Sequence, residues 1–446
     1  MFFKTILYEY GEIILNKKFL LKTLVLTLSI SMLTPFISKV HAEETNPPTI
    51  VSESAIVVDY NTGEIIYEKN GTAKKFLAST TKYMTALLFA EAKQKTDLIT
   101  YSATAKAQPP YTLDNDYMKP YGKTMTVGDT MTADTVMKGL LLFSGNDTAY
   151  MISDAIGGDT AGFSKMMNDK ATEYGLSDTH YENPNGLPVN GADVNYSTAY
   201  DLSVITKHAF ENDWIKEVTS MAEATVTLPK DTKVKLTNRN TELGKNGNIG
   251  GKTGVTDQAG TCFTGVYERD GRKLIGVVLK CDRNNNNTRF EDLNKMMDYS
   301  YLAEKQVYKS SGDEVGTVDL SYKLFGSFGP LKTVTVPIKL AEDVKLYKNA
   351  INDTTLSINM NVANTDAWKV ASQKTTPLTV QVKGYTTEVQ GSIAITKGEL
   401  FKANLMFYIA TAAVLVIALI LIIFIIMLIK NAKKNSRRNS IRGRRR

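Results

Sequence analysis

The sequence predicts an α+β fold, and three observations along its 446 residues support this. Strand-like segments stand at both ends of the largest predicted domain, with helical segments between them. Short alternating strands then fill residues 306–398, and an uncharged apolar run covers residues 405–429. Because strands and helices do not alternate one for one, a doubly wound parallel sheet is excluded. We expect an antiparallel sheet with a helical cluster around it.

Residues 1–42 are typical of a secretory signal peptide. Basic residues precede an apolar run that ends at Ile37, and Val40-His41-Ala42 provides a small-x-small exit. We expect cleavage after Ala42, with an uncleaved signal anchor as the alternative.

The predicted α+β domain covers residues 50–305. Its first strands surround the turn residues Asn61-Thr62-Gly63, and its later strands surround residues 268–272. Apolar residues recur at helical spacing in the segment between these hairpins. The expected elements are strands at 55–60 and 64–68, helices at 79–93, 132–143, 147–156, 160–175 and 198–210, strands at 262–268 and 273–281, and a helix near 287–304.

The two cysteines of the chain, Cys262 and Cys281, fall in the strands of the second hairpin. The spacing predicts that they lie on the same face of the sheet, opposite or diagonal to each other. A disulfide is permitted outside the cell, but its geometry cannot be read from sequence, so a bridge and two free thiols both remain open.

Residues 306–398 predict a small β-rich, sandwich-like domain. Apolar and polar residues alternate with period two at 333–336, 356–359, 378–382 and 392–395. No catalytic set stands out in this region, and its position before the apolar run suggests a stalk.

Residues 405–429 predict a single transmembrane helix. Twenty-five residues without a charge would extend roughly 37 Å as a helix, enough to cross a hydrocarbon core of about 30 Å. The tail, residues 430–446, holds nine basic residues and no acid. Because positive flanks stay inside, we expect a cytoplasmic tail and an extracellular catalytic domain at the cell membrane.

The basic residues at the two ends also account for the net charge of +7. The first 42 residues carry +3 and the tail carries +9, which leaves −5 for the segment between them. The tail is suited to anionic lipid headgroups. The sequence therefore gives no support to nucleic-acid binding.

Ser79-Thr80-Thr81-Lys82 opens the first long predicted helix. Positions i and i+3 share one face of a helix, so the Lys82 amine can reach the Ser79 hydroxyl. A serine needs an adjacent base to become a nucleophile, and a lysine can serve once burial and nearby cations lower its pKa. The tetrapeptide alone is a weak signal, because roughly two matches are expected by chance in a chain of this length.

Two further short motifs follow in the chain. Ser144-Gly145-Asn146 precedes a predicted helix, and Lys252-Thr253-Gly254 lies on the strand after Gly250-Gly251. A cation beside a hydroxyl suits a carboxylate, and a glycine lets a ligand approach the backbone. A second S-x-N triplet, Ser357-Ile358-Asn359, shows that this motif is also weak by itself.

Together and in this order, the three motifs resemble the signature set of penicillin-binding proteins and serine β-lactamases. The surrounding residues resemble more closely the D-alanyl-D-alanine carboxypeptidases, the low-molecular-weight penicillin-binding proteins. The segments that carry this resemblance are 77–82, 144–147, 179–187 and 251–260. The resemblance implies a penicillin-binding, β-lactamase-like transpeptidase fold for residues 50–305, and removal of the terminal D-alanine from peptidoglycan pentapeptide stems.

The resemblance also implies roles in the acyl transfer. Ser79 would attack the D-Ala-D-Ala carbonyl, Lys82 would be the general base, and Ser144 would relay a proton to the departing D-alanine. Backbone N–H groups of Ser79 and Val255 would form the oxyanion hole. β-Lactam antibiotics would acylate Ser79 as covalent inhibitors.

For substrate binding, the resemblance implies that Asn146 holds both the substrate amide and Lys82. Lys252 and Thr253 would bind the terminal carboxylate beside Gly254. No cofactor and no metal are expected, because His, Cys, Asp and Glu form no cluster at ligand spacing.

Two departures and one rival accompany this interpretation. The spanning helix differs from the amphipathic anchor of many relatives, and Asn185 stands where the family often has His, so we assign Asn185 no catalytic role. A serine β-lactamase is the nearest alternative. Glu182 lies near the place of its water-activating carboxylate, but the spacing around Glu182 is wrong for that role.

Overall fold

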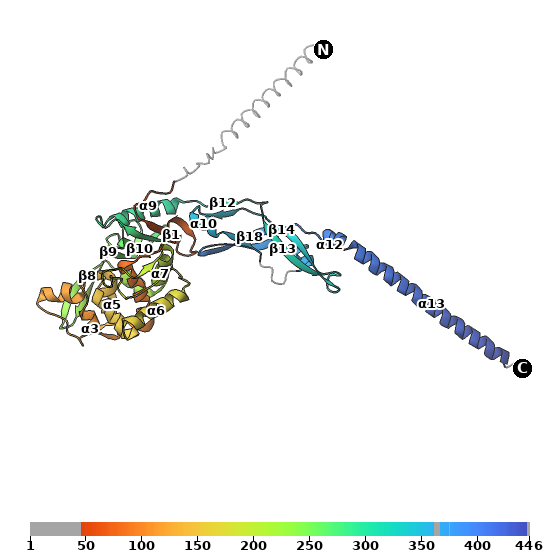
Figure 1. Ribbon diagram of the computed structural model, residues 1–446, viewed down its shortest axis with the longest axis horizontal. Helices are drawn as coiled ribbons and strands as arrows, with labels where there is room; N and C mark the ends of the chain where they lie inside the picture. Colours follow the sequence, from red (N-terminus) through yellow and green to blue (C-terminus); the bar gives the residue numbers. More distant parts are fainter. Residues whose placement is uncertain (1–45, 361–365, 374, 444–446) are drawn as a thin grey trace, which may run out of the picture. The chain divides into compact units, whose positions relative to one another are not determined.

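The computed structural model describes residues 46–360, 366–373 and 375–443 (Figure 1). The expected signal peptide at 1–42 lies outside these residues. The chain from Pro47 onward forms one compact unit.

A five-stranded antiparallel sheet is the centre of the α+β region, as expected for this fold class. Its strand order is β2-β1-β11-β10-β9, so strands from the two ends of the region lie side by side. The strands are β1 (Ser54–Asp59), β2 (Ile65–Lys69), β9 (Asn248–Thr256), β10 (Gly260–Arg269) and β11 (Arg272–Cys281). Residues of β1 alternate between the two faces, with Ile56 and Val58 in one core cluster and Ala55 and Val57 in another.

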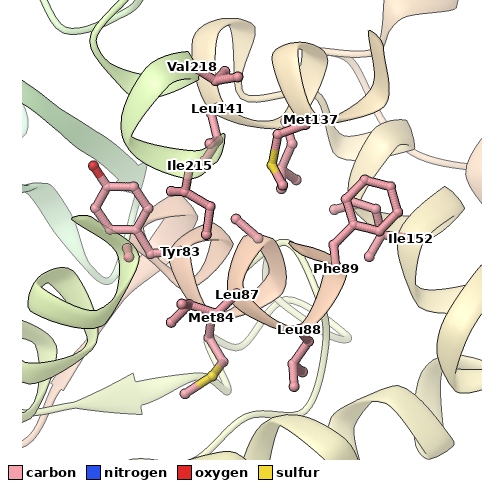
Figure 2. Close-up of a cluster of buried hydrophobic side chains, with 14 of the residues drawn as sticks. Tyr83, Met84, Leu87, Leu88, Phe89, Met137, Leu141, Ile152, Ile215 and Val218 are labelled. Carbon is pink, nitrogen blue, oxygen red and sulfur yellow. The ribbon is translucent and has the colours of Figure 1, made fainter. Parts of the chain in front are cut away.

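Helices cover one face of this sheet and form the larger core cluster. Helix α2 (Lys82–Ala92) is buried from Lys82 to Phe89, which fits a helix that is apolar on all sides. Figure 2 shows its side chains packed among those of neighbouring elements, including Met137, Leu141, Ile152 and Ile215. The other helices and turns of this region are α3 (Ala103–Lys106), η2 (Asp114–Met118), η3 (Lys119–Tyr121), α4 (Ala133–Lys138), η4 (Gly139–Phe143), α5 (Asn146–Ile152), η5 (Ser153–Gly157), α6 (Thr160–Glu173), α7 (Ala199–Glu211) and α8 (Asp213–Thr219).

Three two-stranded ribbons complete the helical side. Each pairs segments that sequence patterning did not identify as strands. In the first two ribbons the strands have only two or three residues, too few to show a reliable period, whereas in the third the strands have six residues each and their alternation was missed. The ribbons are β3 (Lys75–Phe76) with β6 (Tyr196–Ser197), β4 (Leu98–Thr100) with β5 (Thr130–Thr132), and β7 (Glu223–Leu228) with β8 (Thr232–Thr237).

Helix α9 (Thr288–Leu302) packs on the opposite face of the sheet. Cys281 belongs to the core on this side, whereas Cys262 belongs to the core on the helical side. The prediction that both cysteines share a face is therefore wrong. A β-bulge shifts the β10–β11 register between Thr261 and Phe263 and reverses the alternation beyond it. Both thiols are free and buried.

A second five-stranded sheet follows the α+β region, with the order β13-β14-β18-β17-β16. The expected strand at 392–395 is displaced, since β18 ends at Ile393. The elements here are β12 (Gln306–Lys309), β13 (Glu314–Lys323), β14 (Leu331–Leu340), β15 (Val344–Leu346), α10 (Ala350–Thr355), β16 (Ser357–Asn359), α11 (Ala367–Val370), β17 (Thr376–Val382), β18 (Tyr385–Ile393) and α12 (Lys397–Ala403). Strands β12 and β15 pair separately as a ribbon.

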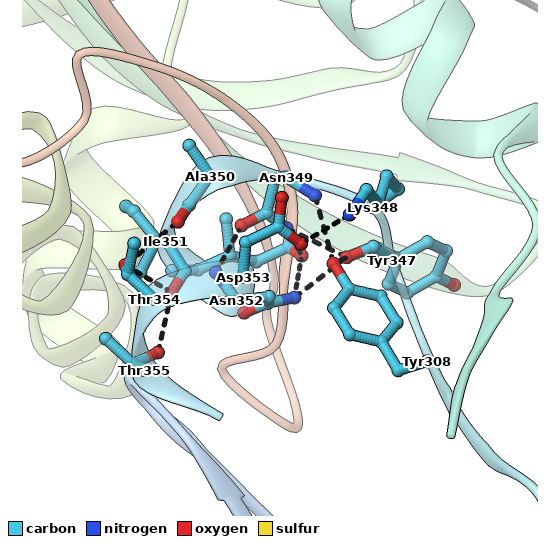
Figure 3. Close-up of polar contacts among 11 residues, drawn as sticks. Tyr308, Tyr347, Lys348, Asn349, Ala350, Ile351, Asn352, Asp353, Thr354 and Thr355 are labelled. Carbon is cyan, nitrogen blue, oxygen red and sulfur yellow. Dashed lines mark hydrogen bonds and ion pairs between the residues drawn. The ribbon is translucent and has the colours of Figure 1, made fainter. Parts of the chain in front are cut away.

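Helix α10 connects this region to strand β2 through two asparagines. The Nδ2 of Asn349 donates to the Ile65 carbonyl at 2.9 Å and to the Tyr347 carbonyl at 3.1 Å. The Nδ2 of Asn352 donates to the same Tyr347 carbonyl at 2.9 Å. Figure 3 shows both asparagines beside Tyr347, with the Tyr308 hydroxyl close to them. Close by, Lys305 and the buried Glu64 form an ion pair at 2.6 Å.

The last helix, α13, runs from Leu405 to Gly443. Among the described residues it is the one helix long and apolar enough to cross a membrane. Within the described part of the chain, its large apolar side chains from Ile409 to Ile429 are exposed.

Candidate active site

The candidate nucleophile lies in a strained turn at the start of α2. Ser79 is part of a 3-10 turn, η1 (Ala78–Thr81), and the α-helix proper begins at Lys82. Ala78 has a φ of +47°, an unfavourable conformation for a residue with a Cβ. Gly186 lies against this turn so closely that a Cβ on it would be 1.9 Å from the Ala78 carbonyl oxygen. The turn before Ser79 is therefore held by its surroundings.

The Lys82 amine is buried and contacts three oxygen atoms. Its Nζ lies 2.9 Å from the Ser79 Oγ, 3.1 Å from the Asn146 Oδ1 and 3.2 Å from the Asn185 carbonyl oxygen. Burial and, to a smaller extent, the positive charge of Arg239 together lower the pKa of Lys82 to about 7. An amine with this pKa, in contact with a serine hydroxyl, can act as a general base near neutral pH.

Asp147 opposes part of this shift from within the protein core. Its carboxylate is fully buried, and its negative charge raises the pKa of Lys82. Burial also raises the pKa of Asp147 itself to about 7, although backbone N–H groups counteract this. One of those groups is the Leu113 N–H, which donates at 2.7 Å. Asp147 thus holds the neighbouring loop at Leu113 and also favours the charged form of Lys82.

Ser144 occupies the left-handed end of a π-helical turn. Its φ is +71° directly after η4, and its side chain is buried. Arg239 caps this turn, since its Nε donates to the Phe143 carbonyl at 2.7 Å and its backbone N–H donates to the Leu142 carbonyl at 3.1 Å. The guanidinium also lies over the Tyr111 ring, 4.5 Å from its centroid. Arg239 therefore both shapes the Ser144 turn and brings charge to the site.

Strand β9 brings the third motif to the same place. The Lys252 Nζ donates to the Ser144 Oγ at 2.8 Å and to the Thr253 carbonyl at 3.1 Å. Burial, followed by the charges of Lys82, Arg239 and Arg289, holds the pKa of Lys252 well below its usual range.

Gly254 packs β9 directly against the nucleophile turn. A Cβ at Gly254 would stand 3.1 Å from the Ser79 nitrogen and 2.8 Å from the Leu77 carbonyl oxygen. Only a glycine permits this approach, which brings the edge strand of the sheet beside Ser79.

A cleft of about 540 Å³ opens over these groups. No Asp or Glu is among its described lining residues, while three arginines are. The lining residues are Ser79, Tyr111, Ser144, Asn146, Leu187, Arg239, Thr241, Thr253, Gly254, Val255, Thr256, Arg283, Asn286 and Arg289. Such a cleft favours an anionic ligand.

The structure brings the eight site residues expected from sequence into one region. Ser79, Ser144, Asn146, Thr253, Gly254 and Val255 line the cleft, and Lys82 and Lys252 lie buried behind it. The side chain of Asn146 contacts Lys82, as the resemblance implies. Ser357 of the second S-x-N triplet lies in β16, paired with Gln381 in the other sheet.

Sequence reasoning missed three contributors to the site. Arg239 and Arg289 follow no motif, and only the three-dimensional packing shows that their charges reach the two lysines. Asn185 contributes through its backbone carbonyl, so the identity of its side chain gave no signal. Glu182, considered for the β-lactamase alternative, instead pairs with His180 at 2.7 Å.

Comparisons with known proteins agree with this geometry. The family model described as D-alanyl-D-alanine carboxypeptidase matches residues 41–283, more than half of the chain. The chain is 28% identical over 288 residues to D-alanyl-D-alanine carboxypeptidase DacF of Bacillus subtilis, covering 64% of this chain and 71% of that protein. It is 30% identical to DacA of Escherichia coli, covering 57% of this chain and 64% of that protein.

A solved structure extends the similarity to three dimensions. The D-alanyl-D-alanine carboxypeptidase from Mycobacterium tuberculosis superposes with a TM-score of 0.53 at 25% identity. The match covers 58% of this chain and 95% of the other. The shared part is therefore the α+β region that contains the cleft.

Proposed function

Because this chain belongs to the family of serine D-alanyl-D-alanine carboxypeptidases, we propose that Ser79 is the nucleophile with which it removes the terminal D-alanine from peptidoglycan pentapeptide stems. The observation that carries the proposal is the contact of 2.9 Å between the Ser79 Oγ and a lysine amine whose pKa is lowered to about 7. A neutral amine at that distance can accept the hydroxyl proton.

In the acylation step, the Ser79 Oγ attacks the carbonyl carbon of the penultimate D-alanine while Lys82 accepts the hydroxyl proton. The oxyanion of the tetrahedral intermediate accepts hydrogen bonds from the backbone N–H groups of Ser79 and Val255. The peptide C–N bond then breaks, and the proton held by Lys82 passes through Ser144 to the departing amine, which leaves Lys82 neutral for the next step. The contact of 2.8 Å between the Ser144 Oγ and the Lys252 amine supports this relay.

In the deacylation step, water takes the place of the departed D-alanine. Lys82 accepts a proton from the water while the water oxygen attacks the acyl carbon. The ester bond to the Ser79 Oγ then breaks. The proton returns to the Ser79 oxygen, which restores the free enzyme. The described residues of the cleft contain no carboxylate that could perform this step, so the same lysine serves as base twice.

Substrate binding rests on the positive charge of the cleft. Lys252 and Thr253 bind the terminal carboxylate, and Asn146 binds the stem amide while it holds Lys82. Because a bound carboxylate favours the charged form of an amine, it restores the proton of Lys252, whose pKa is lowered in the empty cleft. The close packing of Gly254 against the Ser79 turn places the end of β9 along the cleft, where the substrate lies.

The position of the enzyme at the membrane is also part of the proposal. Helix α13 anchors the chain as a single-pass membrane protein, and the basic residues after Ile429 keep the tail in the cytoplasm. The cleft then faces the cell wall, where the stem peptides are.

Mass spectrometry after exposure to penicillin, with D-alanine release measured on the same preparation, tests the assignment. We expect one added penicillin mass on the peptide that contains Ser79, and loss of both labelling and release in Ser79→Ala. Ser144→Ala should slow acylation strongly, whereas its motif counterpart Ser357→Ala should not. Labelling at another serine, or D-alanine release by Ser79→Ala at the parent rate, would contradict the proposal.

A further inference from the structure

The hairpin between β13 and β14 ends in an apolar turn with no role in the proposed chemistry. This turn, residues 324–331, is called the aromatic tip below; its sequence is Leu-Phe-Gly-Ser-Phe-Gly-Pro-Leu. Phe325 and Phe328 stack with ring centroids 5.2 Å apart. Gly329 has a φ of +100°, and a Cβ there would lie 2.8 Å from the Phe325 ring, so the turn is built around this ring pair.

The aromatic tip contacts the start of α13 through several side chains. The Tyr408 hydroxyl donates to the Leu324 carbonyl at 2.6 Å, and the Tyr408 ring packs edge-on against Phe325 at 5.5 Å. Phe401 stacks on the other side of Tyr408 at 4.7 Å. Just outside the tip, Lys332 lies over the Phe407 ring at 4.1 Å. The tip therefore lies beside the first turn of the apolar helix.

The outer surface of this cluster is exposed and apolar. Phe328 is 64% exposed and Leu331 is 70% exposed. Exposed apolar side chains that lie side by side form the kind of patch that marks an interaction or membrane surface. On the neighbouring helix, Phe407 is 54% exposed. The apolar surface of α13 thus continues onto the tip.

The charges next to the tip have a single sign. Between Leu320 and Ala341 the chain carries three lysines and no acid. Two of them, Lys323 and Lys332, lie at the base of the tip, where they suit phosphate groups. Aromatic rings with basic residues beside them are typical of the membrane–water interface.

We propose that the aromatic tip inserts into the outer interface of the lipid bilayer that α13 crosses, as a second membrane contact of the chain. Phe328 and Leu331 enter the acyl boundary, and Lys323 and Lys332 bind the headgroup phosphates. The lipid bilayer is the occupant favoured here because the exposed surface is continuous with the helix and because its rim is basic. This inference rests on the proposed membrane anchor, and it adds that the second sheet is fixed to the membrane surface.

A fluorescence experiment tests the proposal. The full-length chain carries a probe and is reconstituted into vesicles of phosphatidylcholine and phosphatidylglycerol. An environment-sensitive dye is attached at Ser327→Cys in the tip, and nitroxide-labelled lipids serve as quenchers. We expect emission shifted to the blue and at least twofold quenching by lipids labelled near the headgroup. The parent chain, whose Cys262 and Cys281 are buried, measures background labelling.

Two control positions separate the possible results. Thr386→Cys places the dye on an exposed site of β18 that pairs with Gln381 of β17, and it should not be quenched. Ala412→Cys places it on α13 and should be quenched by lipids labelled deep in the acyl chain. If Ala412→Cys is quenched and Ser327→Cys behaves like Thr386→Cys, the inserted tip is refuted while the anchor stands. If neither is quenched, the anchor itself fails.

The apolar side chains themselves can be tested in the same chain. Replacing Phe328 and Leu331 together by aspartate should reduce quenching at Ser327→Cys to the level of Thr386→Cys, because insertion would then bury two charges. Unchanged quenching in this variant would show that the probe is merely close to the bilayer, and would overturn the proposal. A blue shift without quenching would assign the surface to a second copy of the chain, and would overturn it as well.

Discussion

Replacing Arg239 by glutamine should move the acid limb of the pH–rate profile for acylation to higher pH. Lys82 must be neutral to accept the Ser79 proton. With its ordinary pKa of 10.5, about 0.03% of the amine would be neutral at pH 7, whereas a pKa of about 7 makes roughly half of it neutral. The site thus increases the active form by more than a thousandfold, and the charge of Arg239 is part of the cause.

The expected shift of the acid limb depends on how much the Arg239 charge lowers the pKa of Lys82. Burial is the first cause of the low pKa of Lys82, and Arg239 is the second, so removing the guanidinium should raise the pKa of Lys82. One nearby charge changes a pKa by at least about one unit, so a rise of about one unit is the smallest expected effect. At pH 6.5 the neutral fraction then falls from about a quarter to about 3%, and acylation slows by roughly tenfold. Well above the new pKa, near pH 9.5, the difference in neutral fraction almost vanishes.

Stopped-flow acylation by a chromogenic cephalosporin, measured from about pH 5.5 to 10, gives the limb directly. Arg239→Lys is the matched control, because it keeps the charge but loses the planar contact with the Tyr111 ring. Arg269→Gln removes a positive charge that pairs with Asp298 at 2.7 Å, away from the cleft. Both should keep the parent limb.

Two results would contradict this reasoning about Arg239 and Lys82. If Arg239→Gln lowers the rate equally at every pH and leaves the acid limb in place, Arg239 acts only by holding the Phe143 carbonyl, and its charge does not tune Lys82. A parent profile with no acid limb near neutrality would instead contradict the assignment of Lys82 as the base.

Three further substitutions test the framework around the site. Gly186→Ala should reduce penicillin acylation at least a hundredfold, because the new methyl group collides with the Ala78 carbonyl. The control is Gly122→Ala. Gly122 has a φ of +67° and no neighbour within 4 Å, so its replacement adds only backbone strain and should keep activity. Leu141→Ala should lower the free energy of unfolding by about 2–5 kcal/mol in urea titrations, since it opens a cavity in the buried cluster beside α2. Asn352→Ala should cost about 1 kcal/mol in the same titration, because the Tyr347 carbonyl loses one buried donor while Asn349 still donates to it.

These three predictions have clear opposite outcomes. Parent-like acylation by Gly186→Ala would mean that the turn before Ser79 relaxes freely. Equal losses in the two glycine variants would assign the effect to backbone strain alone. A neutral Leu141→Ala would show that the core around α2 collapses into the space, and a neutral Asn352→Ala would show that water replaces the amide.

Local chemistry explains which parts of the site could be predicted from sequence. Ser79 and Lys82 are three residues apart, so their contact follows from the geometry of one helical turn. Ser144 and Lys252 are 108 residues apart, and only the resemblance to a family could place them together. Arg239 belongs to no motif and reaches the cleft through the packing of the segment after β8, which sequence patterning cannot provide.

The register of the sheet shows a second limit. Both faces of the β10–β11 pair are buried, Cys262 toward the helices and Cys281 toward α9. In a strand with one solvated face, apolar and polar residues alternate, and a one-residue bulge shifts this alternation by one position. The bulge is then visible in the sequence. With apolar residues required on both faces, the pattern looks the same before and after the bulge. This is why the two cysteines were predicted on one face and lie on two.

The positive charges of the cleft also connect the two halves of the proposed cycle. A bound terminal carboxylate raises the pKa values of Lys252 and Lys82, because it favours the charged form of both amines. While the carboxylate is bound, less of Lys82 is in the neutral form that accepts a proton. When the product D-alanine leaves, that negative charge leaves with it, and the pKa of Lys82 returns to about 7, so roughly half of the amine is neutral near pH 7 and can accept a proton from water. A ring-opened β-lactam stays tethered with its carboxylate in place, so Lys82 stays protonated for longer. The same electrostatics that drive turnover of a peptide therefore favour a long-lived acyl-enzyme with the antibiotic.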